Sequence, residues 1–296
     1  MITLIATGGT ISCTPAEGGL SPAADSTQLA RFLAAVQRDA DVLPLMNKDS
    51  TDITADDMAL IARAAADAYE NGADGIIITH GTDTMAYTAA YLTCALDGIP
   101  IPVILTGSQL PFDAPDSDAP ANLRNAFDAI GKGFTGVHIL FGDKVLYGDR
   151  ATKAHTRDVC AFVSPKEISG TVGEDIICMC PPPTEKPFTL RVPARTKVGA
   201  VRLTPYTTED ELYNAARLCP DGIVIEGFGL GGVPSRLIEA VSRISRECTV
   251  LLNTQCLFDG VDAGVYAVGS AAVKAGAKPV DMTTEAAIAS LMFLMI

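Results

Sequence analysis

Two short segments combine glycine with hydroxyl side chains in a pattern that suits nucleophilic chemistry. They are TGGTI at 7–11 and HGTDT at 80–84, and the first follows the apolar run 2–6 while the second follows 76–78. Adjacent glycines allow positive φ and bring N–H groups close to a ligand, and a neighbouring threonine offers a nucleophile or a hydrogen bond. Taken alone, Gly-Gly-Thr is also typical of a structural turn. The glycine spacing fits neither a dinucleotide site nor a nucleoside triphosphate loop.

A hydroxyl nucleophile needs a base, and histidine is scarce in this chain. Only His80, His138 and His155 are present, and there is no G-x-S-x-G or H-E-x-x-H segment. We therefore expect no Ser-His-Asp triad, no metal site and no cofactor. His138 lies in an apolar strand pattern and is expected to be structural, and His80 is expected to hold its loop by hydrogen bonds. A lysine can replace histidine as a base, and Lys153 is the candidate.

The charge balance argues against anionic partners. Lysine and arginine number 22 and acidic residues 35, which gives a formal net charge of −13. Such a chain repels nucleic acid and anionic membranes. The apolar tail 286–296 is too short for a membrane helix, which needs roughly 20 residues, and is expected to be a buried terminal helix. The first residues carry no basic segment typical of export, so we expect a cytoplasmic protein.

Eight cysteines are scattered over the chain and do not form the dense framework of a small disulfide-rich fold. We expect mostly buried thiols. The closest pair, Cys178 and Cys180, has a one-residue spacing that fits neither a zinc knuckle nor a C-x-x-C redox site. A structural role is therefore expected for this pair.

Apolar runs alternate with helical periodicity along most of the chain, which predicts an α/β fold with a parallel sheet. In the first part we expect strands at 2–6, 75–79, 101–105 and 136–141, a hairpin into 144–147, and helices at 55–71, 84–97 and 119–131. Thr54 and Asp57 resemble a capping box, and Gly72 ends that helix. In the second part we expect strands at 198–204, 222–226 and 249–253, helices at 208–218 and 235–246, and terminal helices from 269.

The proline-rich segment 181–193 interrupts this alternation and marks a surface connection. We expect a larger N-terminal α/β domain over 1–180, a linker over 181–197 and a smaller C-terminal α/β domain over 198–296. Ligands of open parallel sheets bind beyond the carboxyl ends of the strands. The two glycine–threonine segments therefore define the expected site.

At these residues the sequence resembles the bacterial-type L-asparaginase family, over nearly the whole chain and in order. Several segments are closer to the cytoplasmic type I branch than to the periplasmic type II branch. The matching segments are TGGTI at 7–11, DSTD at 49–52, HGTDTM at 80–85, LTGSQ at 105–109, TKAH at 152–155, AFVSP at 161–165, NTQC at 253–256 and DMT at 281–283.

The resemblance implies an enzyme that hydrolyses L-asparagine to L-aspartate and ammonia, with minor glutaminase activity. It implies Thr10 as the nucleophile and Thr82, Asp83 and Lys153 as the second part of the site. It also implies that Asp83 binds the substrate ammonium, that Ser50 and Thr51 bind its carboxylate, and that Ser108 lies near the leaving amide. A homo-oligomer, dimer or tetramer, is implied as well.

Three positions depart from the family pattern. Leu20 stands where the mobile loop usually carries a tyrosine thought to activate the nucleophile, although Ser12, Thr14 and Ser21 offer other hydroxyls. Gly232 stands where many relatives have an asparagine that helps to build the neighbouring subunit's site. Glu226 stands where some type I members with an effector site have a basic residue. Turnover is therefore expected to be slow if nothing replaces the tyrosine, and effector control is not expected.

Two other functions compete with the amidohydrolase. The loss of the loop tyrosine also fits a weakly active or inactive asparagine-binding or sensing homologue. The amidase subunit of a tRNA-dependent amidotransferase shares these motifs. It is disfavoured by the net charge and by a family signature within the first ten residues, which leaves no room for an extra N-terminal domain.

Overall fold

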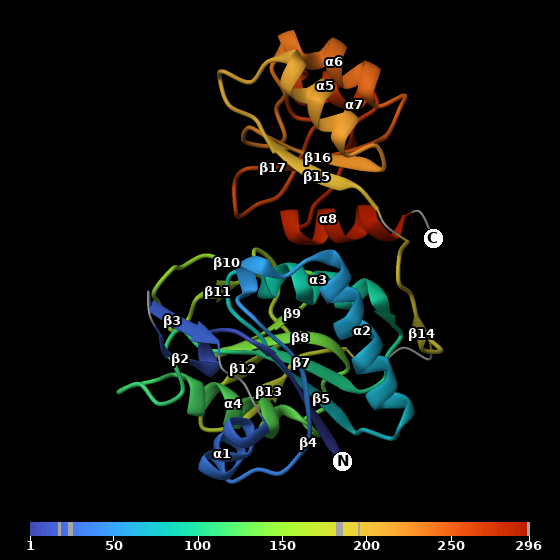
Figure 1. Cartoon of the computed structure of the whole chain (residues 1–296). Helices are drawn as coiled ribbons and strands as arrows, with labels where there is room; N and C mark the ends of the chain where they lie inside the picture. The colour runs from blue at the N-terminus through green and yellow to red at the C-terminus, as the bar shows by residue number, and fades with distance from the viewer. Residues whose placement is uncertain (17–18, 23–25, 182–185, 195, 295–296) are drawn as a thin grey trace. The chain divides into compact units, whose positions relative to one another are not determined.

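The computed structural model describes residues 1–16, 19–22, 26–181, 186–194 and 196–294, with only the backbone described for those between 14 and 26. The chain divides into two compact units, Met1–Val192 and Pro193–Ile296. The expected linker includes residues 182–185 and 195, which lie outside the described residues. The predicted α/β class is confirmed: each unit is built on a sheet with helices on both faces (Figure 1).

The first unit contains an eight-stranded sheet whose parallel part holds five strands. Its order is β13-β12-β9-β8-β7-β5-β1-β4. The parallel strands are β4 (Asp41–Lys48), β1 (Ile2–Gly8), β5 (Gly75–Thr79), β7 (Pro102–Thr106) and β8 (Gly136–Phe141). The antiparallel strands are β9 (Lys144–Tyr147), β12 (Gly170–Val172) and β13 (Ile176–Cys178). The predicted hairpin is β8–β9.

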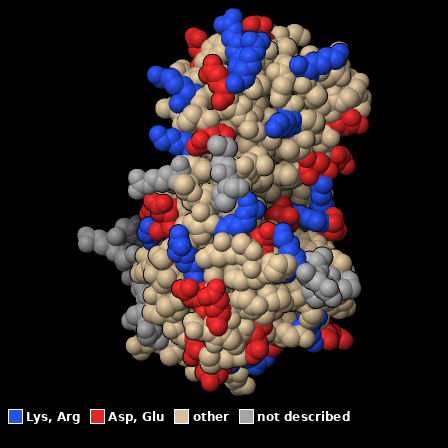
Figure 2. Space-filling view, turned by 90° about the vertical axis from the view of Figure 1, so that its right-hand side faces the viewer, with Lys and Arg blue, Asp and Glu red and all other residues tan. Residues whose placement is uncertain are grey.

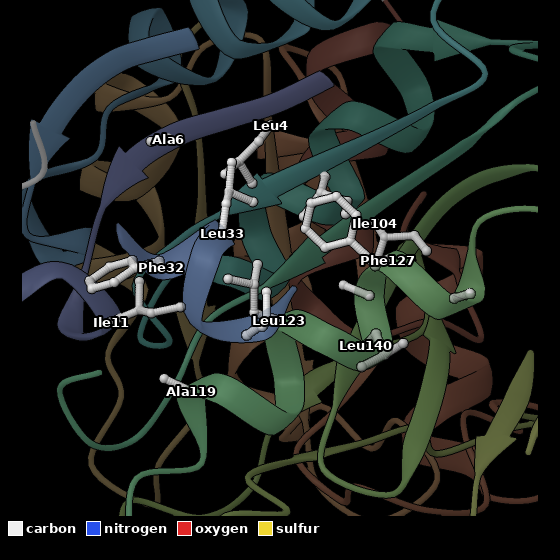
Figure 3. Close-up of a cluster of buried hydrophobic side chains, with 14 of the residues drawn as sticks. Leu4, Ala6, Ile11, Phe32, Leu33, Ile104, Ala119, Leu123, Phe127 and Leu140 are labelled. Carbon is white, nitrogen blue, oxygen red and sulfur yellow. The ribbon is translucent and has the colours of Figure 1, made fainter. Parts of the chain in front are cut away.

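Helices cover both faces of this sheet. Helices α1 (Ser26–Val36) and α4 (Ala119–Ala129) lie on one face, and α2 (Ala55–Glu70) and α3 (Met85–Ala95) lie on the other (Figure 1). Because both faces are covered, the central strands are apolar throughout. Figure 3 shows the core under α1 and α4, where Leu4 and Ile104 from the strands meet Phe32, Leu123 and Phe127.

Local signals account for the ends of α2. Thr54 accepts from the Asp57 N–H while the Asp57 carboxylate accepts from the Thr54 N–H, so the predicted capping box is confirmed. Gly72 follows Asn71 with φ +89°, the left-handed conformation that ends many helices. The predicted bounds of this helix are therefore correct to one residue.

The sequence pattern predicts no element between residues 12 and 48, where the structure has several. They are the hairpin β2 (Cys13–Ala16) and β3 (Gly19–Pro22), helix α1 and strand β4. Strand β4 lies at the edge of the sheet and contains Pro44, and several of its side chains are exposed. An edge strand tolerates proline and needs no continuous apolar run, so β4 lacks the pattern on which the prediction depends.

The second unit has a four-stranded parallel sheet, with α5 (Glu209–Leu218), α6 (Ile238–Ile244) and α7 (Ala267–Lys274) on one face and α8 (Thr284–Phe293) on the other (Figure 1). Its strands are β15 (Val198–Arg202), β16 (Gly222–Gly227), β17 (Thr249–Thr254) and β18 (Lys278–Pro279). Helix α8 buries Ala287 and Leu291 against the sheet, which confirms the predicted terminal helix. The first turn of the predicted helix 235–246 is a 3₁₀ turn.

The expectation of mostly buried thiols is wrong. All eight cysteines are unpaired, seven are half-buried and Cys256 is exposed. Cys178 and Cys180 pack partly buried against a hydrophobic cluster, and burial raises the pKa of the Cys180 thiol to about 11. In the described part of the chain, no helix has the length and hydropathy required to cross a bilayer.

Basic and acidic side chains are interspersed on the surface that Figure 2 shows. Elsewhere in the first unit, ion pairs such as Lys132–Asp175 and Lys186–Asp97 join side chains of opposite charge. The acidic neighbours reduce the local positive potential, unlike the basic stripe by which proteins bind a nucleic-acid backbone.

Candidate active site

The order of the parallel strands determines where a ligand can bind in the first unit. From β1 the chain continues to β4 on one side, whereas β5, β7 and β8 follow on the other side. The strand order reverses at β1 and β5, and open α/β sheets bind ligands at such a switch point, beyond the carboxyl ends of the strands. The TGGTI segment follows β1 and the HGTDT segment follows β5, so both lie at this point.

Two glycines bring these segments into contact. Gly9 has φ +81°, and a Cβ added to it would lie 2.3 Å from the Gly81 nitrogen. A Cβ on Gly81 would lie 2.6 Å from the Ser50 hydroxyl oxygen. Such distances exclude any side chain at either position, so glycine is required here for the close approach. Thr10 directly follows Gly9 and Thr82 directly follows Gly81, so both threonines lie next to this contact.

The loop that carries Thr10 is held mainly through its backbone. The Gly9 N–H donates to the Lys48 carbonyl at 3.0 Å, and the Thr7 hydroxyl donates to the Thr79 carbonyl at 2.9 Å. Thr10 is half-buried and begins a 3₁₀ turn, Thr10–Ser12. The Ser12 hydroxyl donates back to the Gly9 carbonyl at 2.9 Å, so this hydroxyl stabilises the turn.

The family position of the loop tyrosine lies in strand β3. Leu20 pairs with Pro15 through the backbone of the β2–β3 hairpin. The side chains of Leu20, Thr14 and Ser21 lie outside the described residues. The expectation of slow turnover therefore remains a prediction.

Lys153 joins the side chains of Thr82 and Asp83 in the second segment. Its Nζ donates to Thr82 Oγ1 at 2.7 Å and to Asp83 Oδ1 at 2.7 Å. The Lys153 side chain is 17% exposed and that of Asp83 is 56% exposed, so the carboxylate remains within reach of a ligand. Lys153 lies in β10 (Thr152–Lys153), and its position is fixed by antiparallel pairing with the buried Phe162.

Ser50 lies against the second segment. It follows β4 in the 3₁₀ turn Ser50–Asp52 and is buried. Its hydroxyl accepts from the Asp83 N–H at 3.3 Å, and its carbonyl accepts from the Thr84 hydroxyl at 2.6 Å. Thr51 is exposed, and both its N–H and its hydroxyl donate to Asp49 Oδ1 at 2.8 Å. The structure thus joins Ser50 to Asp83, whereas Thr51 is bonded to Asp49.

The loop after β7 contains a clamp that the sequence pattern does not reveal. Ser108 is buried and donates to the Leu110 carbonyl. The Asp118 carboxylate accepts from the N–H groups of Gln109 and Leu110 at 2.9 to 3.1 Å. Asn122 donates to the Gly107 carbonyl at 3.0 Å. An Asp directly before a predicted helix is an available signal, but it indicates a helix cap, and here the carboxylate binds the start of its own loop instead.

Two histidines are structural, as predicted. His80 is fully buried; because a carbonyl only accepts, its Nδ1 donates to the Gly81 carbonyl at 2.7 Å and its Nε2 accepts from Thr88 at 2.9 Å. Burial lowers the pKa of the His80 imidazole to about 4. His138 likewise bonds Thr135 and Ser169, and burial lowers its pKa to about 4.

The chemical groups brought together are a hydroxyl, an amine and a carboxylate beside a glycine contact. Thr82, Asp83, Lys153 and Ser50 form one hydrogen-bonded group. Within the described ranges, no cluster of three or more His, Cys, Asp or Glu residues could bind a metal ion. Such a group can bind a small zwitterion and move a proton at a hydroxyl.

Comparison with known proteins covers both units. The family model described as "Asparaginase, N-terminal" matches residues 1–178, and "Glutaminase/Asparaginase C-terminal domain" matches 197–296. The L-asparaginase of Thermococcus kodakarensis is 39% identical, over 98% of this chain and 91% of that protein. L-asparaginase 1 of Escherichia coli K12 is 32% identical, over 98% and 90%. A glutamyl-tRNA(Gln) amidotransferase component of Pyrococcus furiosus is 32% identical, over 99% of this chain but 72% of that protein.

Solved structures of L-asparaginases are also similar to this chain. The thermostable L-asparaginase from Thermococcus kodakarensis superposes with a TM-score of 0.91 at 38% identity, over 99% of this chain and 92% of that chain. A probable cytoplasmic L-asparaginase from Campylobacter jejuni superposes with a TM-score of 0.84 at 25% identity, over 99% and 94%. The similarity therefore extends over both units of the fold.

Replacing Gly9 by alanine tests the glycine contact. Gly9 and Gly72 both have positive φ, at +81° and +89°, but no atom lies within 4 Å of a Cβ added to Gly72. Gly72→Ala should lose about 1–2 kcal/mol from its positive φ. Gly9 has φ +81° and ψ 178°, a conformation that almost only glycine adopts, so its backbone cost is about 1–3 kcal/mol. Gly9→Ala should lose about 1–3 kcal/mol more, because its Cβ overlaps backbone atoms. Urea unfolding measures both values, and equal losses would show that the contact does not constrain the loop.

The buried histidines predict a loss of stability in mild acid. The unfolded chain protonates its histidines near pH 6.5, whereas the pKa of folded His80 and His138 is about 4. As the pH falls from 6.5 towards 4, the unfolded state binds protons that the folded state does not, so the free energy of unfolding falls. Between pH 7.5 and 5.5 this loss is about 1.4 kcal/mol for each buried histidine.

The variant His80→Gln should remove about half of that loss, as measured by urea unfolding at both pH values. His155 is exposed, so His155→Gln is the matched control and should keep the full pH dependence. An unchanged pH dependence in His80→Gln would mean that His80 is protonated in the folded state.

Proposed function

The chain belongs to the asparaginase family, and on this basis we propose that it hydrolyses the side-chain amide of L-asparagine to give L-aspartate and ammonia, with L-glutamine as a minor substrate. The observation that carries the proposal is the bonding of Lys153 to both Thr82 and Asp83, at 2.7 Å each, beside the glycine contact that positions Thr10. The similarity over both units to proteins named L-asparaginase supports the same reaction.

The charges of the substrate match two sides of the site. The Asp83 carboxylate uses Oδ1 for Lys153, and its exposed remainder can accept the substrate ammonium. The Ser50 hydroxyl accepts from the Asp83 N–H, so its own hydrogen can be donated to the substrate carboxylate. Thr51 would assist only after its hydroxyl turns away from Asp49. Pairing both charges matters because an unpaired charge in a closed site is costly.

The proposed reaction uses a covalent intermediate. The Thr10 hydroxyl attacks the amide carbon, and N–H groups of the two glycine loops stabilise the oxyanion. The C–N bond then breaks, ammonia leaves with the proton taken from Thr10, and water hydrolyses the ester to regenerate Thr10. Lys153 accepts this proton and returns it to the leaving group, and its bonds to Thr82 and Asp83 hold its amine beside them. Ser108 would act near the leaving amide through its place at the end of β7, although its hydroxyl is bonded to Leu110.

The main alternative from the sequence is a binding homologue that turns over slowly. Leu20 supports it, because leucine cannot accept a proton. The amidotransferase alternative is less favoured, since the similarity covers 72% of that relative but 91% and 90% of the two asparaginases. Asparagine binding without ammonia release would separate the first alternative from the amidohydrolase.

We place the protein in the cytoplasm. A similar structure is described as a probable cytoplasmic L-asparaginase. All eight cysteines are unpaired, as is usual in a reducing compartment.

The variant Thr10→Ala tests the proposed nucleophile. Removing a catalytic nucleophile typically lowers kcat by several orders of magnitude, so ammonia release from L-asparagine should fall at least about a thousandfold. Thr10→Ser keeps a hydroxyl and should retain measurable release. Asparagine should still raise the Tm of Thr10→Ala, because Asp83 and Ser50 are intact. Full activity in Thr10→Ala would exclude Thr10, and no release by wild type with a raised Tm would favour the binding homologue.

A homo-oligomer is also proposed, and the second unit offers a surface for it. Large apolar side chains are exposed on two adjoining loops, with Phe228 at 37%, Phe258 at 54% and Tyr266 at 61% exposure. The Asp262 N–H donates to the Leu230 carbonyl at 3.2 Å, which joins the loops. A cluster of exposed apolar residues typically marks a protein interface.

Light scattering should give two or four times the chain mass of 30.9 kDa. The double variant Phe258→Ser/Tyr266→Ser should shift the mass towards one chain, because the interface loses apolar area. Tyr206 is 89% exposed elsewhere in the second unit, so Tyr206→Ser is the control and should keep the wild-type mass. A wild-type mass of 30.9 kDa would contradict the oligomer.

A further inference from the structure

We propose that Gln109 is a positioning residue of the amide hydrolysis, which turns the Thr82 hydroxyl so that its oxygen accepts a hydrogen bond from the attacking group. The inference rests on the proposed function. It concerns a side chain that bonds Thr82 at one end and a neighbouring loop at the other, outside the residues to which the family resemblance assigns a role.

The hydrogen of Thr82 is directed by its two partners. Lys153 donates to Thr82 Oγ1 at 2.7 Å, so one lone pair of that oxygen is used. Thr82 in turn donates to Gln109 Oε1 at 3.3 Å, so its hydrogen is used as well. A hydroxyl has one hydrogen and two lone pairs. What remains on Thr82 is one lone pair, which can only accept.

The amide of Gln109 can adopt only one orientation in this network. Its Nε2 donates to the Asp158 carbonyl at 3.0 Å, and a carbonyl oxygen accepts only. The amide nitrogen therefore faces Asp158, and the amide oxygen faces Thr82. A flipped amide would place the Gln109 amide oxygen against the Asp158 carbonyl oxygen, where both atoms are acceptors, and the hydrogen bond would be lost. The contact with Asp158 therefore keeps the amide oxygen of Gln109 directed at the Thr82 hydroxyl.

The backbone of Gln109 is fixed independently of Thr82. Its N–H donates to both carboxylate oxygens of Asp118, at 2.9 and 3.1 Å, and the Leu110 N–H donates to the same group. Asn122 also donates to Asp118, at 3.2 Å, from the first turns of α4. The side chain therefore extends from a rigid point, which is what a positioning residue requires.

The consequence for the reaction concerns a single hydrogen. With Gln109 present, Thr82 accepts from the hydroxyl or water that attacks and so orients the lone pair of that group towards the amide or ester carbon. Without an acceptor at Gln109, the Thr82 hydrogen can turn into the site and compete as a donor. Misorientation lowers the rate of the chemical step but leaves the groups proposed to bind the substrate, Asp83 and Ser50, in place.

The first test replaces Gln109 by methionine, which has a similar length but no amide. We expect kcat for L-asparagine to fall roughly tenfold, with KM within about twofold of wild type. Leu110→Ala is the matched control on the same loop; it removes an exposed side chain and keeps the backbone clamp, so kcat should be unchanged. A Gln109→Met enzyme with kcat within about twofold of wild type would overturn the inference.

The second test uses Gln109→Glu and the pH profile of kcat. Only the protonated carboxyl can accept from Thr82 while donating to the Asp158 carbonyl, as the amide does. The charged groups around this position are Lys153 on β10, Asp83 after β5, and Asp118 before α4. The ratio of Gln109→Glu to wild-type kcat should therefore rise as the pH falls from about 8 to about 5, through the range in which a carboxyl begins to protonate, whereas the ratio for Gln109→Met stays flat.

The ionised carboxylate can still accept from Thr82 but cannot donate to the Asp158 carbonyl. A flat ratio for Gln109→Glu would therefore overturn the anchoring by Asp158, and this arm gives a result even if Gln109→Met does not fold. The proposed function and the proposed role of Gln109 can be contradicted independently of each other. If wild type releases no ammonia, the proposed function fails. If wild type is active and Thr10→Ala is not, but Gln109→Met equals wild type, only the role of Gln109 fails.

Discussion

The close approach of Gly9 to Gly81 is the constraint on which the rest of the site depends. The two loops can meet only because neither glycine carries a side chain, and Ser50 fills the space on the other side of Gly81. The ends of β1, β5 and β4 therefore converge at one point of the sheet. Hydroxyl and carboxylate side chains leave this point from short turns directly after the strands, and such turns position side chains more precisely than long loops do.

Hydrogen-bonded polar groups hold this convergence in place: His80 and Asn122 are buried and Asp118 is half-buried. His80 bonds the Gly81 carbonyl beneath the contact, and Asp118 and Asn122 bind the loop after β7. Burial of such groups is tolerated because their hydrogen bonds replace those to water. The scaffold under the site is thus polar but neutral at the histidines, and Lys153 and Asp83 form an ion pair above it.

Membership of the asparaginase family does not make this chain identical to its relatives. Glu226 accepts from the Thr284 hydroxyl, and Arg202 lies 3.8 Å from its carboxylate. Glu226 is thus acidic and bonded within its own unit. The resemblance links effector control to relatives that have a basic residue at this position. Gly232 has no side chain and instead accepts from the Phe228 N–H through its carbonyl at 2.9 Å.

The sequence by itself determined the features that depend on local pattern. Buried strands such as β5 and β7 are apolar on both faces, and Thr54 with Asp57 marks the start of α2, so fold class and most elements were predicted correctly. The edge strand β4 was missed because exposure on one side removes that pattern. The motifs also identified Thr82, Asp83 and Lys153, which the structure joins by hydrogen bonds.

Only the tertiary structure decided which of these side chains bond to one another. Lys153 reaches Thr82 across 71 positions in the chain, and Gln109 acquires its orientation from the Asp158 carbonyl. No spacing along the chain records such contacts, because their geometry exists only after the sheet has formed and distant loops have closed on it.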